Sequence, residues 1–228
     1  MSQPYEKPMD LISDLLIKPE STEDAIPTPG ESVRAHRAAR EPVAANRWAL
    51  DRTLALALHS RHGKNWTRAM RRATDLASGP VTVPIAIGMM AWKGQTKGRR
   101  SAEVVGVAWI GAQLVHGSLK LLYHRKRPTL FPPLVKAGGY ALPSGHTVTA
   151  VVTYGLAAAM IGPHVPARWR RVPAVAAGAV VAAVGTSRVY LGVHYPSDVL
   201  AGIFVGGSWL WASLAVLGRV EKHPWWRR

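Results

Sequence analysis

Residues 187–198 bring together three side chains that could do chemistry: Arg188, His194 and Asp198. Pro196 disfavours a helical conformation at the residue before it, so we expect His194 on a turn and a new helix beginning near Pro196. Asp198 then lies in the first turn of that helix, within reach of the His194 ring. A carboxylate on one imidazole nitrogen leaves the other free to attack an electrophile or to take a proton. Alternatively, His194 and Asp198 simply satisfy each other at a helix start, and this stretch alone does not decide.

A second group of polar side chains lies at residues 120–128, where Lys120 and Arg127 precede Pro128. Seven residues are close to two helical turns, so the spacing predicts that Lys120 and Arg127 share a helix face and that Pro128 ends the helix. Two cations directed at one point suit a phosphate, which arginine can bind through two hydrogen bonds. The alternative is a pair of anchors that extend to the water at the end of a membrane helix.

The third group is Ser144, Gly145 and His146, which follow Pro143 and open an apolar run. Serine favours the N-cap of a helix, and a glycine after it lets an anion approach the free backbone amides, so the stretch predicts a phosphate site at a helix N-terminus. His146 would face the same anion. A helix cap followed by a chance histidine is the alternative.

Five apolar runs must position these groups, at residues 79–92, 102–119, 147–163, 172–191 and 198–218. A membrane-spanning helix needs about 20 apolar residues, so the last three runs are long enough, the second is marginal and the first is short. Because consecutive helices alternate in direction, the three polar groups are predicted to meet at one rim. A soluble helical bundle is the competing interpretation; tryptophans near the end of the chain, followed by Arg227 and Arg228, favour a membrane.

The expected fold is all-α, an integral membrane helical bundle with about five spanning helices and N-terminal interfacial helices. We divide the 228 residues into a flexible polar tail (1–46), amphipathic interfacial helices (47–78), a membrane core (79–218) and a basic, aromatic tail (219–228). The net charge is +16, and the basic residues flank the apolar runs, which fits binding to a membrane surface better than binding to nucleic acid. There is no cysteine, and no signal peptide is expected.

The order Lys-x6-Arg-Pro, Pro-Ser-Gly-His and Ser-Arg-x5-His-x3-Asp resembles the type 2 phosphatidic acid phosphatase family, which shares its core with vanadium haloperoxidases. The resemblance covers roughly residues 75–215. It implies that His194 is a nucleophile that forms a phosphohistidine, that Asp198 orients it, and that His146 protonates the leaving oxygen and then activates water. It also implies phosphate binding without a metal or other cofactor, by a further set of residues: Lys120, Arg127, Ser144, Gly145 and Arg188.

The sequence therefore predicts a metal-independent lipid-phosphate phosphatase in a membrane. Three substrate classes stay open: phosphatidate-like lipids, polyprenyl (di)phosphates and polyprenyl-linked sugar phosphates. Two alternatives are a vanadate-dependent haloperoxidase and a non-catalytic protein that binds anionic lipids. The expected partners are the lipid phosphate and membrane lipids, without nucleic acid, and a homo-oligomer is left open. Membrane relatives usually have six spans; here the first is missing, which predicts a plasma-membrane protein with a cytoplasmic active site.

Overall fold

The computed structural model describes residues 49–59 and 63–221, and within these ranges every regular element is helical, as predicted. Two short helices, α3 (Ala49–His59) and α4 (Lys64–Asp75), precede five long ones. The long helices are α5 (Gly79–Lys97), α6 (Arg99–Tyr123), α7 (Gly145–Ile161), α8 (Val172–Tyr190) and α9 (Pro196–Val220), with two 3-10 turns, η1 (Gly162–His164) and η2 (Ala167–Trp169), between α7 and α8.

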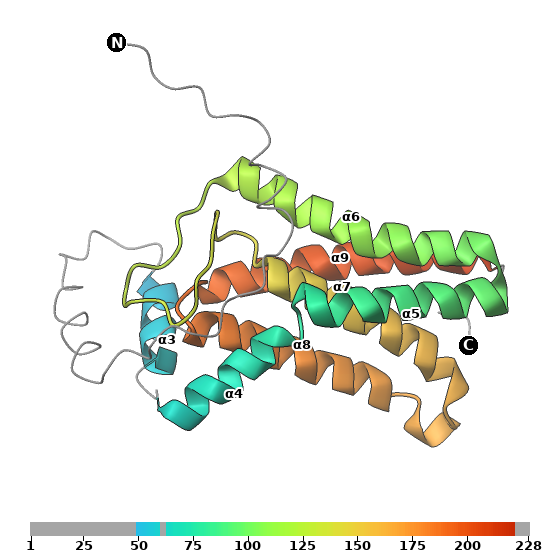
Figure 1. Ribbon diagram of the computed structural model, residues 1–228, viewed down its shortest axis with the longest axis horizontal. Coiled ribbons are helices and arrows are strands. Elements are labelled where there is room, and N and C mark those ends of the chain that lie inside the picture. Colours follow the sequence, from blue (N-terminus) through green and yellow to red (C-terminus); the bar gives the residue numbers. More distant parts are fainter. Residues whose placement is uncertain (1–48, 60–62, 222–228) are drawn as a thin grey trace, which may run out of the picture.

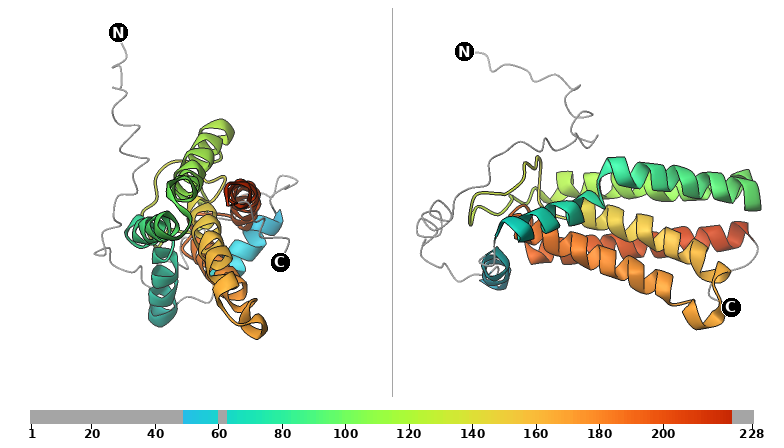
Figure 2. Two further views of the ribbon diagram at one scale, coloured as in Figure 1. Left: turned by 90° about the vertical axis from the view of Figure 1, so that its right-hand side faces the viewer. Right: turned by 60° about the horizontal axis from the view of Figure 1, so that its bottom comes forward.

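The five long helices run along the long axis of the molecule, and each contains most of one predicted apolar run (Figure 1). The runs 147–163 and 172–191 extend past the ends of α7 and α8 by two residues and one residue. The α6–α7 loop, the α8–α9 turn, α3 and α4 gather at one end of the bundle (Figures 1 and 2). The predicted meeting of the three polar groups at one rim therefore agrees with the course of the chain.

Helix α7 is the centre of the bundle, because it packs against α5, α6, α8 and α9. Four segments are long and apolar enough to cross a membrane: Arg99–Tyr123, Gly145–His164, Ala167–Tyr190 and Pro196–Val220. In the most apolar stretch of the α7 segment 61% of the residues are buried, against 22%, 28% and 17% in the other three. The outer helices thus present apolar side chains such as Val107, Val175 and Phe204 outward, as lipid-facing helices do. Helix α5 packs beside α6 as a fifth member of the bundle.

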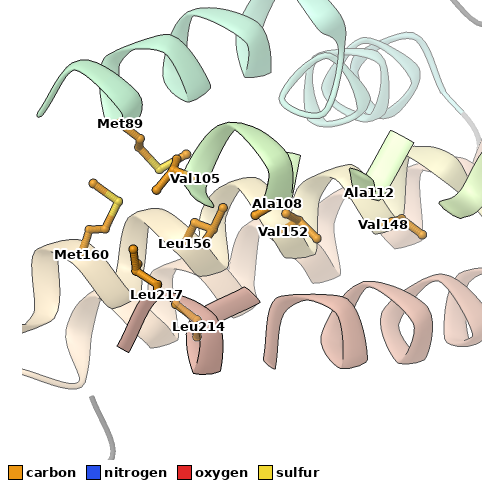
Figure 3. Packing of buried hydrophobic residues seen from close by; sticks show 10 residues of the cluster. All are labelled: Met89, Val105, Ala108, Ala112, Val148, Val152, Leu156, Met160, Leu214 and Leu217. Atoms are coloured by element: carbon orange, nitrogen blue, oxygen red, sulfur yellow. The ribbon is translucent and has the colours of Figure 1, made fainter. Parts of the chain in front are cut away.

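The main core cluster joins α5, α6, α7 and α9 (Figure 3). Val152 and Leu156 of α7 lie at its middle, facing Val105 and Ala108 of α6, and Leu214 closes it from α9. Lipid tails are as apolar as these side chains, so burial drives helix association in a membrane less than close packing does. The fit between helices is therefore the main source of stability in this part of the molecule.

Helices α7 and α9 approach each other closely at Gly202. A Cβ atom at this position would lie 2.9 Å from the carbonyl oxygen of Ser144 and 2.9 Å from the Cβ of Thr147. Both atoms belong to the first turn of α7 or its N-cap, where the backbone cannot yield easily. Gly202 thus permits the contact that brings the start of α9 to the start of α7.

The N-terminal stretch forms the two predicted helices; Trp48 lies outside the described residues. Helix α3 packs on α8 and α9, burying Asp51, Ala55 and His59, and the His59 ring stacks on Phe131 with the ring centroids 3.6 Å apart. Its opposite side exposes Leu50 and Leu54. That α3 and α4 lie at the membrane interface remains a prediction.

We predict that Gly202→Ala lowers the stability of the protein by about 1–3 kcal/mol, because the added methyl group collides with the first turn of α7. Gly207→Ala is the matched control on the same helix, since a Cβ there meets no atom within 4 Å. The apparent melting temperature of each purified variant in detergent measures the effect. Equal melting temperatures for the two variants would contradict the packing argument.

Candidate active site

The turn between α8 and α9 presents His194. Gly192 has φ +77°, in the left-handed region that favours glycine, and a Cβ there would lie 2.5 Å from the Phe131 ring. The backbone amide of His194 donates to the carbonyl oxygen of Arg188 at 3.3 Å, which folds the turn back on the end of α8. Helix α9 begins at Pro196, as predicted.

Asp198 lies in the first turn of α9 and faces His194. Its Oδ2 is 3.6 Å from the Nδ1 of His194 and accepts a hydrogen bond from the backbone amide of Tyr195 at 2.8 Å. Both side chains of the pair are buried. The other ring nitrogen, Nε2, lies 3.4 Å from the Nη1 of Arg127, a group that can only donate. This arrangement favours the tautomer with the proton on Nδ1 and a lone pair on Nε2.

Arg127 reaches the site from a loop, so the prediction that it shares a helix face with Lys120 is wrong. Helix α6 ends at Tyr123, one turn after Lys120, because His124 adopts a left-handed conformation with φ 47°. Pro128 therefore does not end the helix. The Arg127 guanidinium is held by tertiary contacts that no local pattern encodes, donating to the carbonyl oxygens of three residues: Gly138, Gly139 and Val193.

The other two predicted phosphate-binding cations come from helix ends. Lys120 lies in the last turn of α6 and Arg188 in the last turn of α8. Arg188 is only 2% exposed, and its Nη1 donates to the hydroxyl of Thr74 on α4 at 2.8 Å. A guanidinium so deeply buried has its orientation fixed by its surroundings, which suits a group that binds an anion.

The predicted helix N-terminus is present, with Ser144 at the N-cap and Gly145 as the first residue of α7. The Ser144 side chain does not cap the helix; instead, its oxygen accepts a hydrogen bond from the Thr147 hydroxyl at 2.9 Å. The Ser144 amide donates to the carbonyl oxygen of Asp198 at 3.0 Å, which links the starts of α7 and α9. Gly145 lies under a histidine ring, since a Cβ there would be 2.9 Å from the Cε1 of His116.

The positive charges of the site act together on His194. Burial lowers the pKa of His194 well below its ordinary value, and the charges of Arg188, Arg127 and Lys120 act in the same direction. His146, in the first turn of α7, lies close enough to interact with the His194 ring. His194 is therefore neutral at pH 7, the state in which a ring nitrogen can attack phosphorus.

The structure thus brings all eight predicted residues to one end of the bundle, and it adds others that the sequence interpretation missed. Arg125 binds both Asp198 and Asp51. Arg125 and Asp51 each also form a hydrogen bond with Ser197. Asp51 gave one usable signal, since it is an acidic residue on the same face of its short helix as Ala55 and His59. Arg125 gave none, because it lies within a basic run. His116 of α6, whose ring lies against Gly145, is a further residue near the site that the sequence interpretation did not select.

Comparison with known proteins identifies a family through the part of the chain that carries the site. The model of the PAP2 superfamily matches residues 103–222, more than half of the chain, and this range contains all three polar groups. The chain belongs to the PAP2 superfamily. This PAP2 protein is similar to phosphatidylglycerophosphatase B of Bacillus subtilis, with 34% identity over 129 residues that make up 56% of this chain and 61% of that protein. It is also similar to the lipid A 1-phosphatase of Rhizobium etli, with 34% identity over 145 residues, 56% of this chain and 57% of that protein.

Solved structures share the fold. A transmembrane PAP2-type phosphatidylglycerolphosphate phosphatase from Bacillus subtilis superposes with a TM-score of 0.68 at 25% identity, covering 79% of this chain and 89% of that one. Aquifex aeolicus LpxE gives a TM-score of 0.56 at 21% identity, over 75% and 99% of the two chains, which shows likeness of fold alone. With its four candidate spans, the PAP2 protein is an integral membrane protein.

Proposed function

We propose that this PAP2 protein is a phosphatase that releases phosphate from a lipid through a phosphohistidine at His194. The observation that carries the proposal is the environment of the His194 ring. Asp198 faces Nδ1 at 3.6 Å and Arg127 lies 3.4 Å from Nε2, so the nitrogen with the lone pair is directed toward a cation that can bind phosphate. The reported relatives are phosphatases by name, which favours hydrolysis over the haloperoxidase alternative and over passive lipid binding.

In the first step, Nε2 of His194 attacks phosphorus, and the P–N bond forms as the bond from phosphorus to the lipid oxygen breaks. The leaving oxygen takes a proton from His146. The imidazole becomes cationic as it is phosphorylated, and the Asp198 carboxylate stabilises that charge. In the second step, His146 removes a proton from water, whose oxygen attacks phosphorus and breaks the P–N bond. Inorganic phosphate leaves and neutral His194 is restored.

The cations and the α7 N-terminus have an electrostatic role in both steps. Phosphoryl transfer depends mainly on positioning and on stabilising the charge of the equatorial oxygens. Lys120, Arg127 and Arg188 would bind those oxygens, together with the backbone of Ser144 and Gly145 at the start of α7. Two of these cations are held by the protein before substrate binds: Arg127 by three backbone carbonyl oxygens, and Arg188 by its contact of 2.8 Å with the Thr74 hydroxyl.

A phosphate monoester of a glycerolipid is the substrate we favour, because the relative with 61% of its length matched is named a phosphatidylglycerophosphatase. The site lies at the end of helices whose outer faces are apolar, so a headgroup can reach the cations while its chains stay among lipids. A panel of phosphatidylglycerophosphate, phosphatidate, a lipid A-type phosphate and polyprenyl phosphates, scored by phosphate release, tests this choice. Faster hydrolysis of a polyprenyl substrate would overturn it.

We predict that His194→Ala abolishes phosphate release, with a loss of at least a thousandfold, because no other group supplies the nucleophile. Asp198→Asn should retain more activity, since it disturbs only the orientation and charge stabilisation of the ring. Quenching the reaction in base and in acid identifies the intermediate. Labelled phosphate bound to a histidine stays on the protein in base and is lost in acid. Activity of His194→Ala within tenfold of the unaltered protein, at equal melting temperature, would exclude His194 as nucleophile.

We also propose that hydrolysis needs no divalent metal, because the site supplies cations and imidazoles and its Asp198 carboxylate already binds Arg125 and the Tyr195 amide. Magnesium and calcium sites need several oxygen ligands. Exhaustive EDTA treatment is expected to leave the rate unchanged, while vanadate inhibits as a mimic of the pentavalent phosphorus. Loss of activity in EDTA that magnesium restores would count against the mechanism.

The active site is further proposed to face the cytoplasm of a plasma membrane. The support is α4, which lies at the site end of the bundle and exposes Lys64, Arg68 and Arg72, because such a basic surface suits the anionic lipids of the cytoplasmic leaflet. Single cysteines at Lys126 near the site and at Arg100 at the other end can be introduced into this cysteine-free chain. In intact cells a membrane-impermeant maleimide should label Arg100→Cys and not Lys126→Cys, and both after permeabilisation. The reverse pattern would place the site outside.

A further inference from the structure

We propose that Arg125 and Asp51 form a positioning pair that holds Asp198 against His194, so that the N-terminal helix α3 is part of the active-site support. The inference rests on the proposed function for its catalytic meaning and deepens the description of that same site. None of the three motifs contains Asp51, and Arg125 occupies one of the unspecified positions between Lys120 and Arg127.

Arg125 binds the catalytic carboxylate directly. Its Nη1 lies 2.5 Å from the Oδ1 of Asp198 and 2.6 Å from the hydroxyl of Ser197, and its guanidinium stacks over the Tyr195 ring at 4.6 Å. The Asp198 side chain is fully buried, and Arg125 is 13% exposed. Because Oδ1 is engaged by Arg125, the carboxylate can turn only Oδ2 toward the Nδ1 of His194. Arg125 therefore fixes which oxygen, and which angle, the nucleophile meets.

Asp51 in turn fixes Arg125. Its Oδ2 lies 2.9 Å from the Nη2 of Arg125, and its Oδ1 accepts a hydrogen bond from the Ser197 amide at 2.9 Å. The Ser197 hydroxyl also donates to Asp51. Burial alone would raise the pKa of Asp51, but hydrogen bonds from Ser197 and Arg125 outweigh it and keep that pKa below its ordinary value. Asp51 is therefore ionised at neutral pH, and Arg125 lies between two carboxylates.

The charge balance around Asp198 explains why such a pair is needed. A buried carboxylate is costly unless it is paired, and removing one partner from a buried pair is more disruptive than removing an exposed ion pair. The charged and titratable groups that face Asp198 are Asp51 from α3, Lys120 from α6, Arg125 from the following loop, and His194 and Tyr195 from the turn before α9. Arg125 is the cation in direct contact with the carboxylate, so its removal leaves Asp198 without its ion-pair partner.

The test compares Arg125→Gln, Arg125→Lys and Asp51→Asn, with Lys126→Gln as the matched control for losing one positive charge from the same exposed loop. We expect Arg125→Gln to lower kcat by about a hundredfold with little change in KM, since a misplaced ring slows the chemical step. The acid limb of its pH profile should move to higher pH, because Asp198 without its cation takes up a proton more readily. Arg125→Lys should restore the acid limb and recover part of kcat, and Lys126→Gln should match the unaltered protein.

Asp51→Asn should lower kcat by about tenfold, and adding it to Arg125→Gln should cause little further loss, because the two residues act through one carboxylate. A kcat and a pH profile for Arg125→Gln equal to those of Lys126→Gln would overturn the inference. So would fully multiplicative losses in the double variant.

A second measurement tests the positioning role of Arg125 without relying on enzymatic activity. The 15N chemical shifts of histidine-labelled protein, assigned with His194→Gln, report the tautomer of the neutral ring. We expect the Nδ1–H form of His194 in the unaltered protein and in Lys126→Gln, and a mixture of tautomers in Arg125→Gln. An unchanged tautomer in Arg125→Gln would overturn the positioning role. If the unaltered protein releases no phosphate from any lipid of the panel, the proposed phosphatase function fails, and the tautomer measurement still decides the positioning role of Arg125.

Discussion

The buried Asp198 carboxylate is the interaction on which the geometry of the site depends. Its oxygens bind the Arg125 guanidinium and the Tyr195 amide and face the His194 ring, while its backbone carbonyl accepts from the Ser144 amide at 3.0 Å. One residue thus connects the turn after α8, the starts of α9 and α7, and the loop after α6. In a low-dielectric interior an unpaired carboxylate would be unstable, so each of these contacts also supports the folded state.

Close packing of small residues makes this meeting of helix ends possible. Gly202 follows Asp198 by one turn and leaves no room for a side chain against Ser144 and Thr147. The two helix starts are therefore held together by a contact that tolerates no added methyl group. Farther from the site, the cluster around Leu156 and Val152 extends the same interface along the bundle (Figure 3).

The accumulation of cations at the site has an electrostatic cost, and the proposed function would account for it. Lys120, Arg127 and Arg188 repel one another and a protonated His194, and together with burial they keep that ring neutral. A phosphate monoester carries close to two negative charges and would relieve this repulsion when it binds. Binding energy from the phosphoryl group is thus available where charge develops during transfer. The carboxylates of Asp51 and Asp198 are both in direct contact with Arg125.

The sequence by itself determined the helical fold, the five apolar runs, the turn before Pro196 and the three polar groups, because each depends on residues close together in the chain. Helix periodicity and the backbone preferences of proline and glycine are local properties. Tertiary structure decided the rest. Helix α6 ends at Tyr123 and not at Pro128, and the carbonyl oxygens of Gly138, Gly139 and Val193 then hold Arg127 in a loop. The contacts of Arg125 with Asp51 and Asp198 span 74 and 73 residues, and that of Arg188 with Thr74 spans 114, so no local preference of the chain could specify them.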